Sequence, residues 1–466
     1  MERKITSKLL EWKGKEGHRP IVITGCRQIG KTYSVQEFVR GNYLSYAYLN
    51  FESNPDAKAL FEDSLEPETL IPKISMYSNV SLVRGESAII MDEIQACSGA
   101  FSSLKPLADF GIDILCTGSF LGINLEDDDT RLSPLGYIEV LRMYSMDFEE
   151  FLWAMGYNKD LISLVKDSIR SMKPIEGPFN KMMLDAFRIY MVVGGMPAAV
   201  SNYANTRDYP STSKVLKDIR DMLIRDAGRY SRKAGRAKIN ACLESIPTQI
   251  SKENKRFLFR DVEKESKAGS KVYGNALDWI ENAGLSNKCE NITGLIPPLT
   301  RNVRDSHFKV YMSDTGILMS FMDGVDAANV ALREPFSNNG AFVENAVCSE
   351  LVRKGYSVYY YTKENSKLEI DFVIMMSGRV NLIEVKSGKD MRSKSLNTLL
   401  ARKDLDCVGI KLTESNVMRD EHGAIHLPLY APCFFEDNKV SDIHALDVEG
   451  ANALYERLKG KSSEPQ

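Results

Sequence analysis

Gly25-Cys26-Arg27-Gln28-Ile29-Gly30-Lys31-Thr32 is the stretch that decides how the first part of this chain is interpreted. Its spacing is G-x-x-x-x-G-K-[ST], with the apolar run Ile21-Val22-Ile23 before it and a helical pattern through Val35 and Phe38 after it. A strand before and a helix after are the context that makes this spacing specific for a phosphate-binding loop. An ordinary turn containing Gly-Lys-Thr is the alternative, and the order of the flanking elements disfavours it.

The residue types of this loop suit a nucleotide. The glycines let the backbone wrap closely around a phosphate, and successive N–H groups at a helix N-terminus offer positive potential. Lys31 is expected to reach the β- and γ-phosphates, and the Thr32 hydroxyl to hold Mg²⁺. The predicted nucleotide-binding residues are Gly25, Cys26, Arg27, Gln28, Ile29, Gly30, Lys31, Thr32 and Tyr33.

A second nucleotide signature is the apolar run Ser87-Ala88-Ile89-Ile90-Met91, which ends in Asp92-Glu93. At the end of a buried strand, Asp92 would position the hydration shell of Mg²⁺. Glu93 would orient the attacking water or accept its proton. An acidic pair at a strand end is common, but downstream of a phosphate-binding loop it becomes a specific signal.

Two further strands complete the pattern. The run from Ile112 to Ser119 ends in polar residues, and Ser119, with Thr117 as the alternative, is predicted to sense the γ-phosphate. A simple strand-end turn at Gly118 would explain the same residues. Ile138 to Met143 alternates like a last strand. Strands that alternate with helices imply a mostly parallel sheet covered on both faces, with ligands at the strands' C-terminal ends.

Composition limits the class of protein. A chain of 466 residues is too long to fold around a single hydrophobic core, and its length suggests about three domains. A net charge of -3, from 60 basic and 63 acidic residues, gives no global nucleic-acid signature, although a local basic face could still bind phosphates. The eight cysteines form no Cys-x-x-Cys pair, which favours reduced thiols and disfavours a zinc or iron–sulfur site. Without a signal peptide or a long apolar run, we expect a cytoplasmic protein with no membrane partner.

These motifs resemble the AAA-family ATPases of bacteria and archaea in which the ATPase precedes a C-terminal domain of unknown function, a family related to archaeal and STAND-type ATPases. The resemblance rests on Gly25–Thr32, Met91–Gln95, Thr117–Ser119 and Met146–Phe151. It implies ATP and Mg²⁺ as cofactors. Relatives usually carry Gly-Arg before the last strand, whereas this chain has Gly136-Tyr137. Arg131 or Arg142 would then replace that arginine, or the contact is missing.

The middle of the chain carries two further matches to the family, Tyr190–Pro197 with its Gly-Gly-x-Pro and Lys309–Gly316. The first predicts a turn between two helices of a lid, and the second a hinge into the last domain. A helix over 272–283 and strands over 285–293 and 308–312 look like a winged helix, which serves DNA or protein binding.

Four arginines at 225, 229, 232 and 236 are spaced as on one helical face. They would contact a nucleic-acid backbone or a neighbouring subunit's nucleotide. The alternative is a solvated face paired with Asp226 and other acids.

The last domain resembles the PD-(D/E)xK nuclease superfamily through a helical Glu344, a strand Asp371 and the strand pair Glu384 and Lys386. The resemblance implies that Asp371 and Glu384 hold Mg²⁺ with support from Glu344, and that Lys386 stabilises developing charge. Charged residues at strand ends, or a nuclease fold that has lost catalysis and binds a partner, are the alternatives.

The expected fold class is α/β: a P-loop ATPase with a parallel sheet and helical lid, a winged-helix-like middle and a C-terminal α/β nuclease-like domain. The expected divisions are an ATPase core over 1–155, a lid over 156–210, a middle domain over 211–320, a nuclease-like domain over 321–440 and a tail over 441–466. The predicted function is ATP hydrolysis that gates a Mg²⁺-dependent nuclease acting on DNA. The alternative is an ATP-switched binding protein with an inactive nuclease-like domain, with a protein partner or a second copy of the chain as its target.

Overall fold

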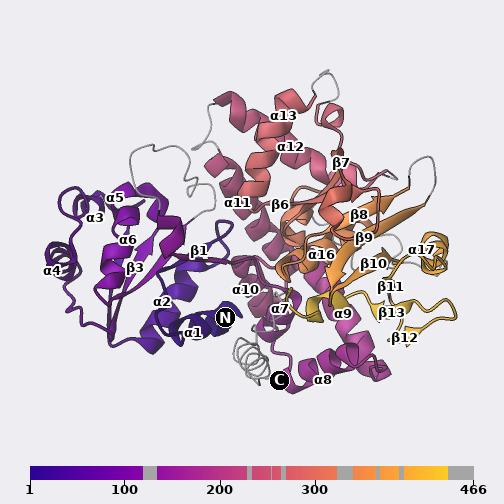
Figure 1. Cartoon of the computed structure of the whole chain (residues 1–466), viewed down its shortest axis with the longest axis horizontal. Coiled ribbons are helices and arrows are strands. Elements are labelled where there is room, and N and C mark those ends of the chain that lie inside the picture. Colours follow the sequence, from indigo (N-terminus) through magenta and orange to yellow (C-terminus); the bar gives the residue numbers. More distant parts are fainter. Residues whose placement is uncertain are drawn as a thin grey trace, which may run out of the picture.

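The computed structural model describes residues 1–118, 134–227, 233–252, 254–263, 269–322, 340–363, 368–387 and 393–438. Figure 1 shows two sheets at opposite sides of the molecule with helices between and around them. The first sheet carries the motifs of the N-terminal third. The second contains the C-terminal strands.

The first sheet has five parallel strands in the order β2-β3-β4-β1-β5. Its strands are β1 (Ile21–Thr24), β2 (Ser45–Asn50), β3 (Ser87–Asp92), β4 (Asp113–Gly118) and β5 (Glu139–Arg142). Because β1 lies between β4 and β5, the loop after β1 is flanked by the ends of these two strands at the sheet's C-terminal edge. The predicted parallel sheet is confirmed.

Side chains alternate between the two faces of this sheet, as strand geometry requires. Ile21 and Ile23 pack in one apolar cluster, and Val22 between them packs in another. Helices α1 (Ile5–Lys13) and α2 (Lys31–Asn42) cover the first face. The second is covered by α4 (Pro67–Ser78), α5 (Ser98–Ser102) and α6 (Leu104–Asp109), and the short α3 (Pro55–Ala59) precedes α4.

A run of helices follows the first sheet, and it includes the expected lid. The helices are α7 (Phe148–Ala154), α8 (Lys159–Arg170), α9 (Gly177–Val193), α10 (Pro197–Thr206), α11 (Tyr209–Ala227), α12 (Lys233–Ile250) and α13 (Ser270–Asn282). Arg225 belongs to α11 and Arg236 to α12, so these two do not share the single helix that their spacing suggested. Arg229 and Arg232 lie outside the described residues.

The second sheet joins the middle of the chain to its C-terminal part. Its order is β12-β13-β11-β10-β9-β8-β6-β7. The strands are β6 (Ser286–Ile292), β7 (Val303–Met312), β8 (Tyr359–Thr362), β9 (Glu369–Met376), β10 (Arg379–Val385), β11 (Cys407–Thr413), β12 (Met418–Arg419) and β13 (Ile425–Pro428). The helices α14 (Thr315–Ser320), α16 (Gly340–Arg353) and α17 (Lys394–Leu400) complete this part.

The hairpin of β6 and β7 was expected to belong to a winged helix. It follows α12 and α13 as expected, but β6 also pairs in parallel with β8. The hairpin therefore forms one edge of the eight-stranded sheet, and strands from both sides of residue 320 share it. Among the described residues, no helix has the length and apolar composition needed to cross a bilayer.

Candidate nucleotide-binding site

The loop after β1 has the backbone that close wrapping requires. Gly25 has φ +147°, and a Cβ there would lie 2.2 Å from the Met143 carbonyl oxygen, so only glycine fits. Gly30 has φ +88° and directly precedes α2. The buried Lys31 ammonium donates to the carbonyl oxygens of Gly25 and Cys26 at 3.0 and 2.8 Å. The loop thus surrounds its lysine at the N-terminus of a twelve-residue helix.

Arg3 fixes this loop from outside. Its guanidinium, in a residue only 8% exposed, donates to the carbonyl oxygens of Ile29 at 2.8 Å and Tyr144 at 2.7 Å. The same group pairs with the Glu150 carboxylate at 3.1 Å. Glu150 in turn completes the capping box of α7 with Asp147. The N-terminal segment therefore holds the phosphate-binding loop against the start of α7.

Asp92 collects hydroxyl and amide donors from three neighbouring elements. Thr32 donates its hydroxyl to Asp92 at 2.8 Å, and Thr117 donates to the same oxygen. Tyr48 and Asn50 at the end of β2 donate to the other oxygen at 2.8 and 2.9 Å. Burial raises the pKa of Tyr48 to about 12, and the bond to Asp92 adds to this, so the phenol stays a neutral donor. The predicted pair of Thr32 and Asp92 is in direct contact.

Glu93 is held by a residue two positions further on. It adopts a left-handed backbone, φ +55°, directly after β3. Gln95 donates its side-chain amide to the Glu93 carboxylate. The other end of the Gln95 amide lies against Gly118, where a Cβ would be 2.6 Å from its oxygen. Gln95 thereby fixes Glu93 beside the end of β4.

Burial also sets the charge state of the loop. It lowers the pKa of Lys31, whereas Cys26, Glu93 and Asp92 act in the opposite direction. Burial raises the pKa of Cys26 to about 11, so this thiol stays protonated at neutral pH. The basic side chains at this loop are Lys31 and Arg27.

Helix α11 and the end of α13 lie against the loop. Arg27 pairs with Asp226 of α11 at 3.1 Å and with Glu52 at 3.4 Å. The Gln28 amide contacts the Met222 sulfur of α11 at 3.2 Å. After α13, a Cβ at Gly284 would lie 3.5 Å from the Cys26 nitrogen. The middle helices thus contact the nucleotide loop directly.

The remaining predicted residues are placed as follows. Tyr33 is 55% exposed on α2. Ser119 and Arg131 lie outside the described residues, and Thr117 makes the contact with Asp92. Arg142, the other candidate for the missing arginine, lines a cavity of about 20 Å³ together with Gly25 and Cys26. Sequence reasoning missed Arg3, Tyr48, Asn50 and Gln95. Only Gln95 lay within a motif already singled out.

The two glycine-containing motifs of the middle form one joint around the buried carboxylate of Asp314. Asp314 accepts hydrogen bonds from the Ser145 hydroxyl at 2.7 Å and the Gly195 amide at 2.8 Å, and it caps α14. A Cβ at Gly195 would lie 2.0 Å from the Met146 carbonyl oxygen, and one at Gly316 would lie 2.3 Å from a carbonyl oxygen of α9. These glycines allow the backbones to approach closely.

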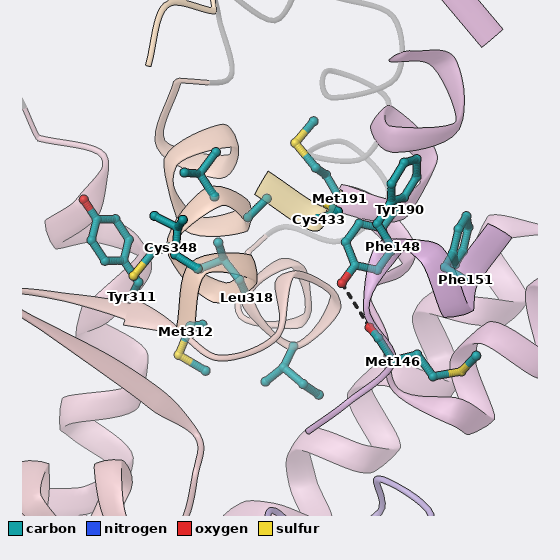
Figure 2. Packing of buried hydrophobic residues seen from close by; sticks show 14 of the residues in the cluster. Met146, Phe148, Phe151, Tyr190, Met191, Tyr311, Met312, Leu318, Cys348 and Cys433 are labelled. Carbon is teal, nitrogen blue, oxygen red and sulfur yellow. Dashed lines mark hydrogen bonds between the residues drawn. The ribbon is translucent and has the colours of Figure 1, made fainter. Parts of the chain in front are cut away.

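Arg353 of α16 extends this joint into the C-terminal part. It donates to the Ser145 hydroxyl at 2.8 Å and to the Ser313 carbonyl at 2.9 Å. Its other nitrogen donates to the Tyr190 hydroxyl at 2.8 Å and to Glu350 at 2.6 Å. Tyr190 donates to the Met146 carbonyl oxygen at 3.0 Å, the dashed line in Figure 2. We call Ser145, Tyr190, Gly195, Asp314 and Arg353 the Asp314 joint.

The joint borders an open cleft of about 1400 Å³ between the N-terminal helix α1 and the C-terminal sheet. Arg353 and Arg142 line it, as do Lys4 and Asp147, which form a salt bridge at 2.5 Å. The cleft extends to Asn438. Its walls come from both ends of the chain.

The C-terminal residues predicted to bind metal each have a protein partner. Lys255 pairs with Glu344, and the Tyr311 hydroxyl donates to the other oxygen of Glu344 at 3.3 Å. Asp371 accepts the backbone amide of Val385 at 2.9 Å. Glu384 pairs with Lys386 at 2.8 Å, as the Glu-x-Lys spacing suggested. In the parts of the chain that the structure describes, no three His, Cys, Asp or Glu side chains come together as metal ligands would.

Comparisons with known families divide the chain in three. Residues 17–152 match the family described as "AAA domain". Residues 184–328 and 339–430 match two separate domains of unknown function. A comparison with curated proteins finds no match. The match over residues 17–152 supports the predicted P-loop ATPase domain in the first third of the chain.

Matches in the comparison with solved structures include two proteins at low structural similarity. The Aeropyrum pernix ORC1 protein in complex with DNA is 11% identical over 73% of this chain and 91% of its own, with a TM-score of 0.29. The Thermotoga maritima RuvB Holliday junction branch migration motor is 12% identical over 62% of this chain and 89% of its own, with a TM-score of 0.30. Scores this low support no inference about function.

Proposed function

We propose that this protein is an ATP-hydrolysing switch whose nucleotide loop acts on the C-terminal part through the Asp314 joint. The observation that carries the proposal is the continuity of contact. The loop touches α11, the end of α13 and segment 142–146, and Ser145 of that segment donates to Asp314. A change at the loop therefore has a packed path to α16.

The donor set suits Mg²⁺ and ATP. Thr32 and Asp92 offer adjacent oxygen ligands, the kind that Mg²⁺ prefers. Lys31 and the backbone amides of the loop would hold the phosphates. Bound there, ATP would supply the γ-phosphoryl group and Mg²⁺ would neutralise its charge.

Within this site the chain's own residues have distinct roles. Glu93 orients the attacking water or takes its proton, and Gln95 holds the Glu93 carboxylate in place. Thr117 supports Asp92, and Ser119 beyond it is the proposed sensor of the γ-phosphate. Arg142 is the proposed replacement for the arginine that relatives carry before the last strand.

The contacts of the loop also explain how occupancy could be transmitted. Lys31 now donates to two loop carbonyls, and Arg27 pairs with Asp226 of α11. Lys31 would exchange those carbonyls for the oxygens of a bound phosphate, and Arg27 would be drawn toward the same negative charge and away from Asp226. Helix α11 would then lose this contact with the loop. The Asp314 joint transmits the resulting movement of the helix to α16. The backbones at its glycines are packed so closely that the joined segments move together.

The output lies in the C-terminal part, where two functions compete. One is a Mg²⁺-dependent nuclease acting on DNA, with Asp371, Glu384 and Lys386 at its centre. The other is a binding module for a protein partner or a second copy of the chain. The ion pair of Glu344 with Lys255 favours the binding module, because a carboxylate already neutralised by a lysine from outside the predicted nuclease set is a poor metal ligand.

The ATPase half is tested with two substitutions. Lys31→Ala should abolish binding of a fluorescent ATP analogue, because it removes the buried cation of the loop. Glu93→Gln should keep binding but slow hydrolysis by about 10²-fold or more, the usual contribution of a positioned base. Met76→Ala, at a side chain on α4 that is 84% exposed and outside the predicted site, is the control and should change neither. Equal turnover in Glu93→Gln and the unsubstituted protein would remove Glu93 from its role.

A further inference from the structure

We propose that Lys255 and Lys309 take the place of a divalent cation among the C-terminal carboxylates, so that this site binds no metal and instead fastens the middle of the chain to the C-terminal sheet. The resemblance to nucleases implies Mg²⁺ at Glu344, Asp371 and Glu384. At Glu344 the donor set does not fit such an ion, because Lys255 already binds this carboxylate. The inference concerns only this site and does not rest on the ATP switch.

Glu344 is the carboxylate that Lys255 neutralises. Its side chain is buried in α16, and the ammonium of Lys255 binds one of its oxygens. The Tyr311 hydroxyl approaches the other oxygen at 3.3 Å. Burial and the nearby Asp371 raise the pKa of Glu344, while the two lysines oppose this rise. A metal would have to displace Lys255 to reach this carboxylate.

Lys309 lies deeper and faces three acids. Its side chain is 3% exposed and pairs with Glu369 at 2.8 Å. Burial alone would lower the pKa of Lys309, but Glu344, Glu369 and Asp371 together hold it above its ordinary value. The ammonium also lies 4.6 Å from the centre of the Tyr360 ring. A fixed positive charge is therefore already present beside Glu344 and Asp371.

The fold brings both lysines to this position. Lys309 is on β7, which reaches the C-terminal strands because β6 pairs with β8. The Phe257 amide donates to the Phe308 carbonyl at 2.8 Å, which ties the segment of Lys255 to the same strand. The lysines therefore come from the middle of the chain, whereas the carboxylates come from the C-terminal part. Breaking their ion pairs would leave buried charges unpaired, which is strongly unfavourable.

Mn²⁺ binding to the full chain without nucleotide tests this assignment. Electron paramagnetic resonance counts bound Mn²⁺, and Asp92→Asn identifies any contribution from the phosphate-binding loop. The variant with Asp371→Asn as its single substitution should show the same Mn²⁺ binding isotherm as the unsubstituted protein. Mn²⁺ binding that Asp371→Asn abolishes would overturn the proposal, and this comparison needs no lysine variant.

The lysines are then tested directly. The double variant Lys255→Met with Lys309→Met keeps the length of both side chains and removes both charges. It should gain Mn²⁺ affinity by about tenfold or more, because two neighbouring positive charges no longer repel the ion, and Asp371→Asn should abolish that gain. The pair Lys255→Arg with Lys309→Arg keeps the charges and should show no gain. A folded double methionine variant with unchanged affinity would overturn the role of the lysines.

Discussion

Replacing Arg3 tests how strongly the N-terminal segment supports the nucleotide loop. Arg3→Ala removes one buried ion pair and two hydrogen bonds to carbonyl oxygens, those of Ile29 and Tyr144. Breaking a buried pair from one side costs about 3–5 kcal/mol. In the variant, Glu150 still accepts hydrogen bonds from the backbone amides of Lys4 and Asp147, which favours the lower end of this energy range. We therefore expect the free energy of unfolding to fall by about 3 kcal/mol.

The assay combines urea unfolding with ATP-analogue titration. Arg3→Ala should lower both stability and nucleotide affinity, because the Ile29 carbonyl loses the guanidinium that fixes the loop. Arg3→Lys keeps the charge, but its compact ammonium cannot span the three acceptors that separate nitrogens of the guanidinium reach. It should therefore recover only part of the stability and of the nucleotide affinity. Lys8→Ala, which removes an exposed pair with Asp437 at 3.6 Å, is the control and should cost less than about 1 kcal/mol. If Arg3→Ala matches Lys8→Ala in both measurements, the anchoring role is refuted.

Three further substitutions probe other parts of the chain. Gly195→Ala places a methyl group 2.0 Å from the Met146 carbonyl oxygen, so thermal unfolding should begin at a clearly lower temperature, whereas exposed Gly177→Ala should be tolerated. Burial would raise the pKa of Asp147, but Lys4 outweighs it and lowers the pKa to about 2. The stability from this pair is therefore complete above about pH 4 and is lost as the pH falls toward 2, and an acid titration of Lys4→Met should show a smaller loss. In a Mg²⁺-dependent cleavage assay on several forms of DNA, the unsubstituted protein and Asp371→Ala should be equally inactive, and cleavage that depends on Asp371 would restore the nuclease prediction.

Local patterns were enough to predict the elements around the phosphate-binding loop. The loop over 25–32, the strand ending at Asp92 and the helix after Gly30 depend on residues close together in the sequence. Their spacing and periodicity therefore carry the signal. The residues that support the site could not be predicted in this way. Arg3 and Glu150 are 147 positions apart, and their contact produces no periodic pattern in the sequence.

The C-terminal part shows the same limit. Glu344 lies on a helix, α16, and Asp371 and Glu384 lie on strands, β9 and β10, as their local patterns predicted. The partner of the β6–β7 hairpin was missed, because alternating side chains specify a strand but not the strand beside it. The contact between Lys309 and Glu369, which are 60 positions apart, therefore could not be predicted from the sequence pattern.

Hydrogen exchange of the C-terminal part with and without a non-hydrolysable ATP analogue tests the switch most directly. We expect the analogue to change the rate of amide hydrogen exchange in α11 and also in α16, which lies more than 300 residues beyond the loop in sequence. In Asp314→Asn, which weakens the joint but leaves the loop intact, the change should remain in α11 and disappear from α16. If the analogue binds the loop of the unsubstituted protein but leaves exchange in α16 unchanged, the loop does not act on the C-terminal part as proposed.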